Sequence, residues 1–222
     1  MTDSPALDRK KWLVFLIVAA LSLVADQATK IWARGALPVT RFGHGTAICV
    51  VPDDMMPRHT TVNGEGRDLA PDCHGEAVTV IGGFWKWRLS MNPGSAFGLF
   101  SSQTGARIGL SVVGVIAVFG MLWMLRKARS DQKILHWALA LVAGGAVGNL
   151  IDRIYFGVVT DFVLWYYDIH EWPVFNVADV VLVIGVGLMF IDIQKEGRRE
   201  KALKAGRQDK AKAAGLIKDL RV

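Results

Sequence analysis

The residues of this sequence that could do chemistry are aspartates and asparagines placed in or beside long apolar stretches. They begin in GGAVGNLIDR, continue in GVVTDF and end in FNVAD, which together cover residues 144–179. An ionisable side chain in the middle of a membrane costs roughly 2.5–3.5 kcal/mol on insertion scales. Because a membrane-length segment that keeps several such groups must use them, we expect these residues to form a functional site.

Paired carboxylates are the chemistry that suits this set of residues best. Two neighbouring aspartates cannot readily both ionise, so they share a proton; one activates a water molecule and the other protonates the scissile carbonyl. A zinc protease is less well supported because His170-Glu171 lacks the second histidine of HExxH, and Ser95 has no evident base for a serine hydrolase. We therefore predict neither a metal ion nor a cofactor.

Four aspartates are candidates for the pair, and their neighbours in sequence separate them. Asp26 has Lys30 one helical turn away, and Asp152 is followed directly by an arginine, so each has a basic neighbour that favours its ionised form. Asp161 and Asp179 lie among apolar residues without a basic neighbour. We therefore predict Asp161 and Asp179 as the catalytic pair, and pairs that include Asp152 are the alternative.

Four apolar stretches approach the roughly 17–25 residues that span a bilayer. They cover residues 12–31, 108–125, 135–151 and 174–193, and 52% of the chain is hydrophobic. A soluble protein with four buried helices is the alternative, but the second stretch has only scattered serine and glycine where a soluble helix has a polar face. We predict an all-α membrane protein, a single domain over 1–222, with four transmembrane helices. The first is expected to stay uncleaved because a signal-peptidase cut before its aspartate would lack a small residue.

Basic residues indicate how these helices cross the membrane. Ten of the 26 lysines and arginines lie in the tail 194–222, and others cluster at 9–11 and 126–133. Short basic segments mark the cytoplasmic side, so both termini are predicted to be cytoplasmic, and segments 34–107 and 154–173 to face the periplasm. The tail is expected in solvent or on anionic lipid. The same clustering argues against a nucleic-acid-binding role for the net charge of +6.

The predicted periplasmic segment 34–107 combines an irregular insertion with a hairpin. Residues 42–72 are rich in glycine, proline, aspartate and histidine. AVTVIGG and FWKWRLS then form two short runs about a Gly-Gly turn, and Trp85 and Trp87 alternate with basic residues. We predict a small β-hairpin with an apolar face at the outer membrane interface, where tryptophan is favoured. A loop anchored by its tryptophans is the alternative.

Cys49 and Cys73 are the only cysteines in the sequence, and both belong to the irregular part of this segment. In an oxidising compartment a disulfide between them would restrict the unfolded states of a long loop. The sequence alone does not distinguish a disulfide from two free thiols. A zinc site that adds His59 and His74 is the less favoured alternative, because the spacing matches no common pattern.

The predicted topology places the polar residues at one depth, near the outer ends of their helices or in the segments that connect those ends. Asp161 is expected in a loop between the third and fourth helices. The topology rests on lysine and arginine alone, so this agreement is independent support for a single site. A small transporter that relays protons or cations through its aspartates is the alternative function, but it needs polar groups spread through the membrane. The cluster comprises Asp26, Lys30, Asn92, Asn149, Asp152, Arg153, Asp161, Asn176 and Asp179.

The motifs DQATK, NPGSAFG, GGAVGNLIDR, GVVTDF and FNVAD, in this order over residues 12–193, resemble those of the signal peptidase II family. The resemblance implies a multi-pass aspartic endopeptidase of the bacterial inner membrane, with its active site toward the periplasm. It implies cleavage of diacylglyceryl-modified prolipoproteins just before the lipidated cysteine, inhibition by globomycin-type antibiotics and a β-cradle that holds the substrate. We also expect a monomer that contacts membrane lipid and does not bind nucleic acid.

The resemblance implies the same catalytic pair, Asp161 and Asp179. The sequence departs from the family at Thr160, where valine is more frequent, which we expect to leave the role of the next residue intact. The insertion 42–72 is longer than usual, and the basic tail carries no family motif. The remaining motif positions are expected to support the pair and the substrate: Asp26, Lys30, Asn92, Gly94, Asn149, Asp152, Arg153 and Asn176.

Overall fold

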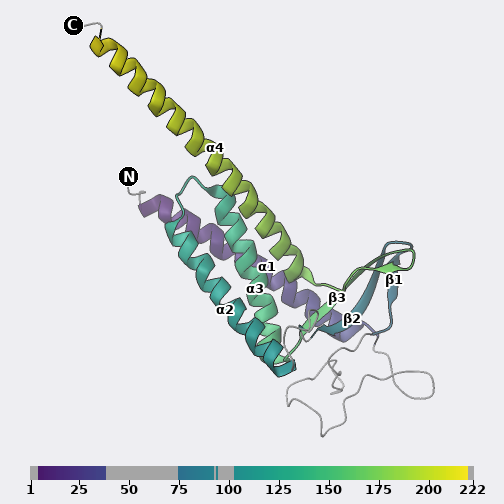
Figure 1. The fold of residues 1–222 in the computed structure, drawn as a ribbon. Helices are drawn as coiled ribbons and strands as arrows, with labels where there is room; N and C mark the ends of the chain where they lie inside the picture. Colours follow the sequence, from purple (N-terminus) through teal and green to yellow (C-terminus); the bar gives the residue numbers. More distant parts are fainter. Residues whose placement is uncertain (1–4, 39–74, 93, 95–102, 220–222) are drawn as a thin grey trace, which may run out of the picture.

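The computed structural model describes residues 5–38, 75–92, 94 and 103–219, which form four α-helices and a small β-sheet (Figure 1). The helices are α1 (Pro5–Ala36), α2 (Gln103–Lys127), α3 (Lys133–Tyr155) and α4 (Val177–Asp219). The strands are β1 (Val78–Ile81), β2 (Trp85–Asn92), β3 (Val159–Tyr167) and β4 (His170–Glu171). The insertion 42–72 and both predicted disulfide partners, Cys49 and Cys73, lie outside the described residues.

Each helix contains a segment that is long and apolar enough to cross a membrane, so the prediction of four membrane-length helices is confirmed for the described residues. The segments are Arg9–Ala36, Arg107–Lys127, Lys133–Tyr155 and Val177–Gln208. Every helix is longer than its predicted apolar stretch. The largest difference is in α4, which continues without a break through most of the basic tail and projects beyond the other three helices (Figure 1).

α3 is the central helix of the bundle, because it packs against α1, α2 and α4. Its glycines allow the neighbouring helices to approach closely. A Cβ atom at Gly145 would lie 2.6 Å from the carbonyl oxygen of Ala178 in α4, and one at Gly148 would overlap the carboxylate of Asp26 in α1. The segment GGAVG is therefore a helix-packing motif.

The four strands form one antiparallel sheet in the order β1-β2-β3-β4. The predicted pairing of two strands is present as β1 and β2, while the location of this hairpin at the outer membrane interface stays a prediction. The sheet is larger than predicted because β3 pairs with β2. In that register Asp161 lies opposite Ser90. The expectation that Asp161 lies in a loop is wrong: VTDFVLWYY is rich in β-branched and aromatic residues and forms a central strand.

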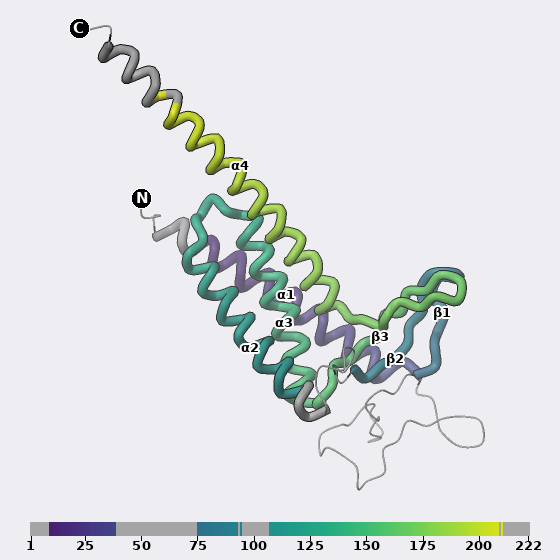
Figure 2. Tube along the Cα trace, in the orientation of Figure 1, coloured from purple at the N-terminus to yellow at the C-terminus, as the bar shows by residue number. Residues whose placement is uncertain are grey.

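The sheet lies at one end of the bundle, and the α2–α3 connection and the far part of α4 lie toward the other end (Figure 2). It is attached to the last turns of α1 by an apolar cluster that includes Ala33, Leu89, Met91 and Phe162. A bulge in β2 between Trp87 and Ser90 shifts the pairing with β3 within this region. The sheet therefore closes the end of the bundle where the polar residues of α1, α3 and α4 meet.

Candidate active site

The polar residues predicted as one cluster come together where the sheet meets the ends of α1 and α3 and the start of α4. Most of their side chains are buried, and Asp26, Lys30, Asp152 and Asn176 have no exposed surface. Hydrogen bonds and ion pairs link them across five segments of the chain. The linked residues are Asp26 and Lys30 of α1, Asn92 of β2, Asn149 and Asp152 of α3, Asp161 of β3, and Asn176 and Asp179 at the start of α4.

Lys30 is the centre of the ionic part of this cluster. Its Nζ lies 2.9 Å from Asp26 Oδ2 and 3.4 Å from Asp152 Oδ2, and it donates a 2.8 Å hydrogen bond to Asn149 Oδ1. Two buried carboxylates thus face one buried ammonium group, and both also accept backbone N–H bonds: Asp26 from Ala178 and Asp152 from Thr160, each at 2.9 Å. The predicted Asp26–Lys30 ion pair is present, and Lys30 extends it to Asp152.

Arg153 does not hold Asp152, contrary to the expectation from their adjacency. Consecutive residues of a helix point in different directions, and Arg153 Nη1 instead lies 3.4 Å from the carbonyl oxygen of Asn149. Among the described residues, the cations within 4 Å of Asp152 are Lys30 at 3.4 Å and Arg34 at 3.9 Å. Asp152 therefore belongs to a buried network between α1 and α3.

The start of α4 explains the spacing of FNVAD. Asn176 precedes the helix, and its Oδ1 accepts a 3.0 Å hydrogen bond from the backbone N–H of Asp179, while Asp179 Oδ2 accepts one of 3.2 Å from the backbone N–H of Asn176. This reciprocal arrangement is a capping box, which needs its two side chains three residues apart. Asp26 accepts a further N–H of this first turn, from Ala178. The motif thus starts the helix and positions Asp179.

The carboxyl groups of Asp161 and Asp179 have neutral hydrogen-bond donors. Asp161 accepts from Asn176 Nδ2 at 2.6 Å and from Asn92 Nδ2 at 3.0 Å. Asp179 accepts from Asn149 Nδ2 at 2.9 Å, in addition to its backbone donor. Asn176 and Asn149 are themselves joined by a 3.1 Å hydrogen bond. Both aspartates are thus held in place without an ion pair of their own among the described residues.

Burial and a neighbouring negative charge make Asp161 a weak acid. The side chain is only 2% exposed, and burial, followed by the charge of Asp179, raises the pKa of Asp161 from 3.8 to about 7. The hydrogen bonds from Asn92 and Asn176 and the charge of Lys30 oppose this rise only in part. Asp161 therefore carries a proton for a large fraction of the time at neutral pH, whereas the half-buried Asp179 is the more accessible carboxyl group.

Asn92 is oriented by the turn that follows it. Its Oδ1 accepts a 2.8 Å hydrogen bond from the backbone N–H of Gly94, which leaves Nδ2 to donate to Asp161. Gly94 has a φ of +82°, and a Cβ atom there would overlap the side chain of Leu110 in α2. Glycine is therefore required at this position by both backbone conformation and space.

Two further residues, Gln27 and Arg34, which the sequence reasoning did not name, complete the network together with Thr160. Gln27 Nε2 donates to Asp26 at 3.1 Å and to Asp152 at 3.3 Å. Arg34 donates a 2.8 Å hydrogen bond to Thr160 Oγ1, which valine could not accept. Thr160 therefore links α1 to the strand that carries the next residue, Asp161. The available signal was the spacing of Asp26, Lys30 and Arg34, which places three charges on one face of α1.

Comparisons with known proteins indicate the family to which this chain belongs. Residues 18–195 match the family described as signal peptidase (SPase) II. A protein named lipoprotein signal peptidase from Geobacter metallireducens is 31% identical over 192 residues, which are 86% of this chain and 97% of the relative. One of the same name from Xylella fastidiosa is 32% identical over 182 residues, 80% of this chain and 87% of the relative.

The fold is also similar to that of solved structures. A bacterial membrane enzyme determined by the in meso method at 2.3 Å resolution has a TM-score of 0.58 and 22% identity, covering 82% of this chain and 88% of that chain. A second such structure, at 1.9 Å resolution, has a TM-score of 0.57. Because the family match covers most of its length, this chain belongs to the signal peptidase II family of membrane proteases.

Proposed function

We propose that Asp161 and Asp179 are the catalytic pair of this protease, which removes signal peptides from diacylglyceryl-modified prolipoproteins just before the lipidated cysteine. The observation that carries this proposal is the contrast between the two kinds of aspartate. Asp26 and Asp152 face the ammonium group of Lys30, whereas Asp161 and Asp179 are held by neutral donors. The negative charge of Asp179 is one reason why the pKa of Asp161 rises to about 7. Membership of a protease family favours hydrolysis over the alternative of a proton or cation relay.

In the proposed reaction, Asp179 is the base and Asp161 is the acid. The ionised Asp179 removes a proton from a water molecule as the water oxygen attacks the scissile carbonyl carbon. Asp161 donates its proton to the carbonyl oxygen, which produces a neutral tetrahedral diol. Collapse then breaks the C–N bond: Asp179 gives its proton to the leaving amine, and a diol hydroxyl returns a proton to Asp161. Each carboxyl group regains its starting protonation state.

We further propose that the site faces the periplasm from the bacterial inner membrane, with both termini in the cytoplasm and residues 1–222 in a single domain. The basic segments that indicate the cytoplasmic side, 9–11 and 126–133, lie at the opposite end of the bundle from the sheet (Figure 2). Exposed aromatic side chains on β3, including Trp165 and Tyr167, suit a substrate-holding cradle at a membrane surface. We also propose that the enzyme is a monomer, that it contacts membrane lipid and that globomycin-type antibiotics inhibit it.

The experiment that tests the proposal is cleavage of a purified diacylglyceryl-modified prolipoprotein by the purified full-length enzyme. Asp161→Asn and Asp179→Asn are each expected to lower the cleavage rate at least about a thousandfold while the protein stays folded. Full activity in either variant would refute the assignment. Asp168→Asn is the matched control, because Asp168 is exposed and lies in the β3–β4 turn; it is expected to cleave at the wild-type rate.

A further inference from the structure

A cavity lies at the end of the bundle opposite to the candidate active site. It has a volume of about 300 Å³ and opens between the first turns of α1, the α2–α3 connection and the first turns of α3. Three lysines line it, Lys10 and Lys11 from α1 and Lys133 from α3, together with His136 and Trp137. The residues that line it include no aspartate or glutamate, so the cavity is strongly basic.

The floor of this cavity is held by the backbone of the α2–α3 connection. The buried Lys11 donates a 3.0 Å hydrogen bond from Nζ to the carbonyl oxygen of Ala128. The buried His136 has its Nε2 at 3.0 Å from the carbonyl oxygen of Arg129. The other two lysines are exposed, and Trp137 keeps 51% of its surface exposed. The cavity therefore has a fixed floor and a cationic rim with an aromatic side chain.

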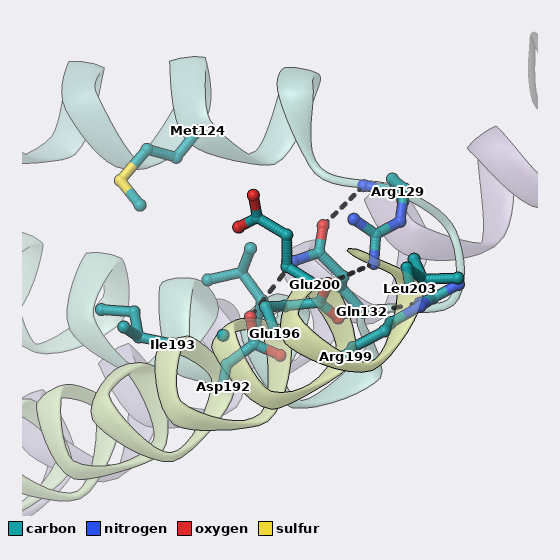
Figure 3. A pocket seen from close by; sticks show the side chains of 11 residues that line it. Met124, Arg129, Gln132, Asp192, Ile193, Glu196, Arg199, Glu200 and Leu203 are labelled. Carbon is teal, nitrogen blue, oxygen red and sulfur yellow. Dashed lines mark hydrogen bonds and ion pairs between the residues drawn. The ribbon is translucent and has the colours of Figure 1, made fainter. Parts of the chain in front are cut away.

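The acidic side chains described at this end of the molecule lie on the other side of the same connection. Three of them, Asp192, Glu196 and Glu200, line a separate cavity of about 740 Å³ between α4 and the α2–α3 connection (Figure 3). There Arg129 pairs with Glu196 at 2.7 Å, and Arg199 pairs with Asp131 at 2.5 Å. In the larger cavity the arginines are paired with acidic side chains. In the smaller cavity three lysines lie together, and no acidic residue is among those that line it.

The depth of the basic cavity suits a lipid headgroup. Lys10, Lys11 and Lys133 belong to the first turn of two membrane-length segments, Arg9–Ala36 and Lys133–Tyr155. The ends of such segments lie at the level of the headgroups, where tryptophan is also favoured. Val14 lies one turn further along α1 and lines the same cavity, so an apolar wall continues toward the hydrocarbon region.

We propose that this cavity binds the headgroup of an anionic phospholipid, with the phosphate between Lys10 and Lys133, the glycerol against Trp137 and an acyl chain along Val14. Basic pockets between transmembrane helices are suited to such headgroups, and each lysine near the membrane surface adds to the affinity for anionic lipid. The site is separate from the aspartate pair, so it does not depend on the proposed peptidase mechanism.

The test is native mass spectrometry of the full-length protein in neutral detergent, titrated with a short-chain phosphatidylglycerol or phosphatidylcholine. The wild type is expected to bind one phosphatidylglycerol in preference to phosphatidylcholine. The double variant Lys10→Gln/Lys133→Gln is expected to bind phosphatidylglycerol about 25-fold more weakly, from about fivefold for each lysine. Lys11 is left unchanged because it holds the α2–α3 connection.

The matched control is Lys195→Gln/Lys201→Gln, which removes the same charge from two exposed positions on α4 that do not line either cavity. It is expected to keep the wild-type affinity; an equal loss in this control would refute a site and indicate diffuse attraction. Inorganic phosphate at the same concentration is expected not to displace the lipid. Displacement by phosphate, or equal binding of both lipids, would refute the lipid assignment.

Discussion

Replacement of Asp161 by asparagine is expected to stabilise the enzyme at alkaline pH, although the residue is proposed to be catalytic. Burial and the charge of Asp179 raise the pKa of Asp161 from its ordinary 3.8 to about 7 in the folded protein. The folded state then binds more protons than the unfolded state between those values, so the stability that Asp161 contributes falls as the pH rises from about 4 to 7. The loss is nearly complete only above about pH 8, where the group is ionised in both states.

The size of the effect follows from the shift. A rise of the pKa from 3.8 to about 7 corresponds to about 4 kcal/mol in total at 1.36 kcal/mol per pKa unit, and about 2–3 kcal/mol of this develops between pH 5 and pH 8. Asp161→Asn removes the titration, so its stability relative to the wild type should rise by about that amount over this interval. For a chain of 222 residues this is a difference of roughly 5–10 °C in Tm.

The assay is thermal unfolding of the purified protein in detergent at pH 5 and pH 8. The difference in stability between the two pH values is compared for each protein, so any cost of the substitution that does not depend on pH cancels. Repulsion between the new amide group and the amide group of Asn92 or Asn176 is such a cost. Asp168→Asn, which changes an exposed aspartate at a φ of 54° that asparagine also tolerates, should keep the wild-type pH dependence. The reasoning is wrong if the wild type and Asp161→Asn lose stability equally between pH 5 and pH 8.

Three other substitutions test the buried network by thermal unfolding. Lys30→Met leaves two buried carboxylates facing each other and should cost about 3–5 kcal/mol, whereas a loss below about 1 kcal/mol would contradict the ion-pair geometry. Thr160→Val leaves Arg34 without its hydroxyl acceptor and should cost about 1–3 kcal/mol; unchanged stability would show that this link is dispensable. Gly148→Ala should destabilise by about 1–3 kcal/mol, whereas Gly120→Ala, with open space at its Cβ, should be neutral or stabilising.

The membrane-length helices and the members of the polar cluster were predictable because both depend on local sequence. Apolar length alone indicates a membrane span, and the ends of those spans determined which polar residues would share a depth. The capping-box spacing of Asn176 and Asp179 is equally local. The β1–β2 hairpin followed from alternation about a Gly-Gly turn. Each of these features needs only residues that are close in sequence.

The strand β3 was not predicted, because its pairing partner β2 lies about seventy residues earlier in the chain. A strand of nine residues that ends in aromatic side chains can also be read as a loop at a membrane surface until its partner is known. The consequence for the site is direct, since pairing with β2 brings Asn92 close enough to donate to Asp161. The asparagine that orients one of the two proposed catalytic carboxyls therefore depends on a long-range contact.

The residue types, their order and their approximate depth are properties of the sequence, because hydropathy, charge and motif spacing act over a few helical turns. The partners of each aspartate are properties of the tertiary structure. Adjacency suggested that Arg153 would hold Asp152, yet Lys30 of α1 occupies that place across a helix interface made close by Gly148. Side chains on different elements are brought together only by packing, so the division between ion-paired and amide-held carboxylates is decided by the fold.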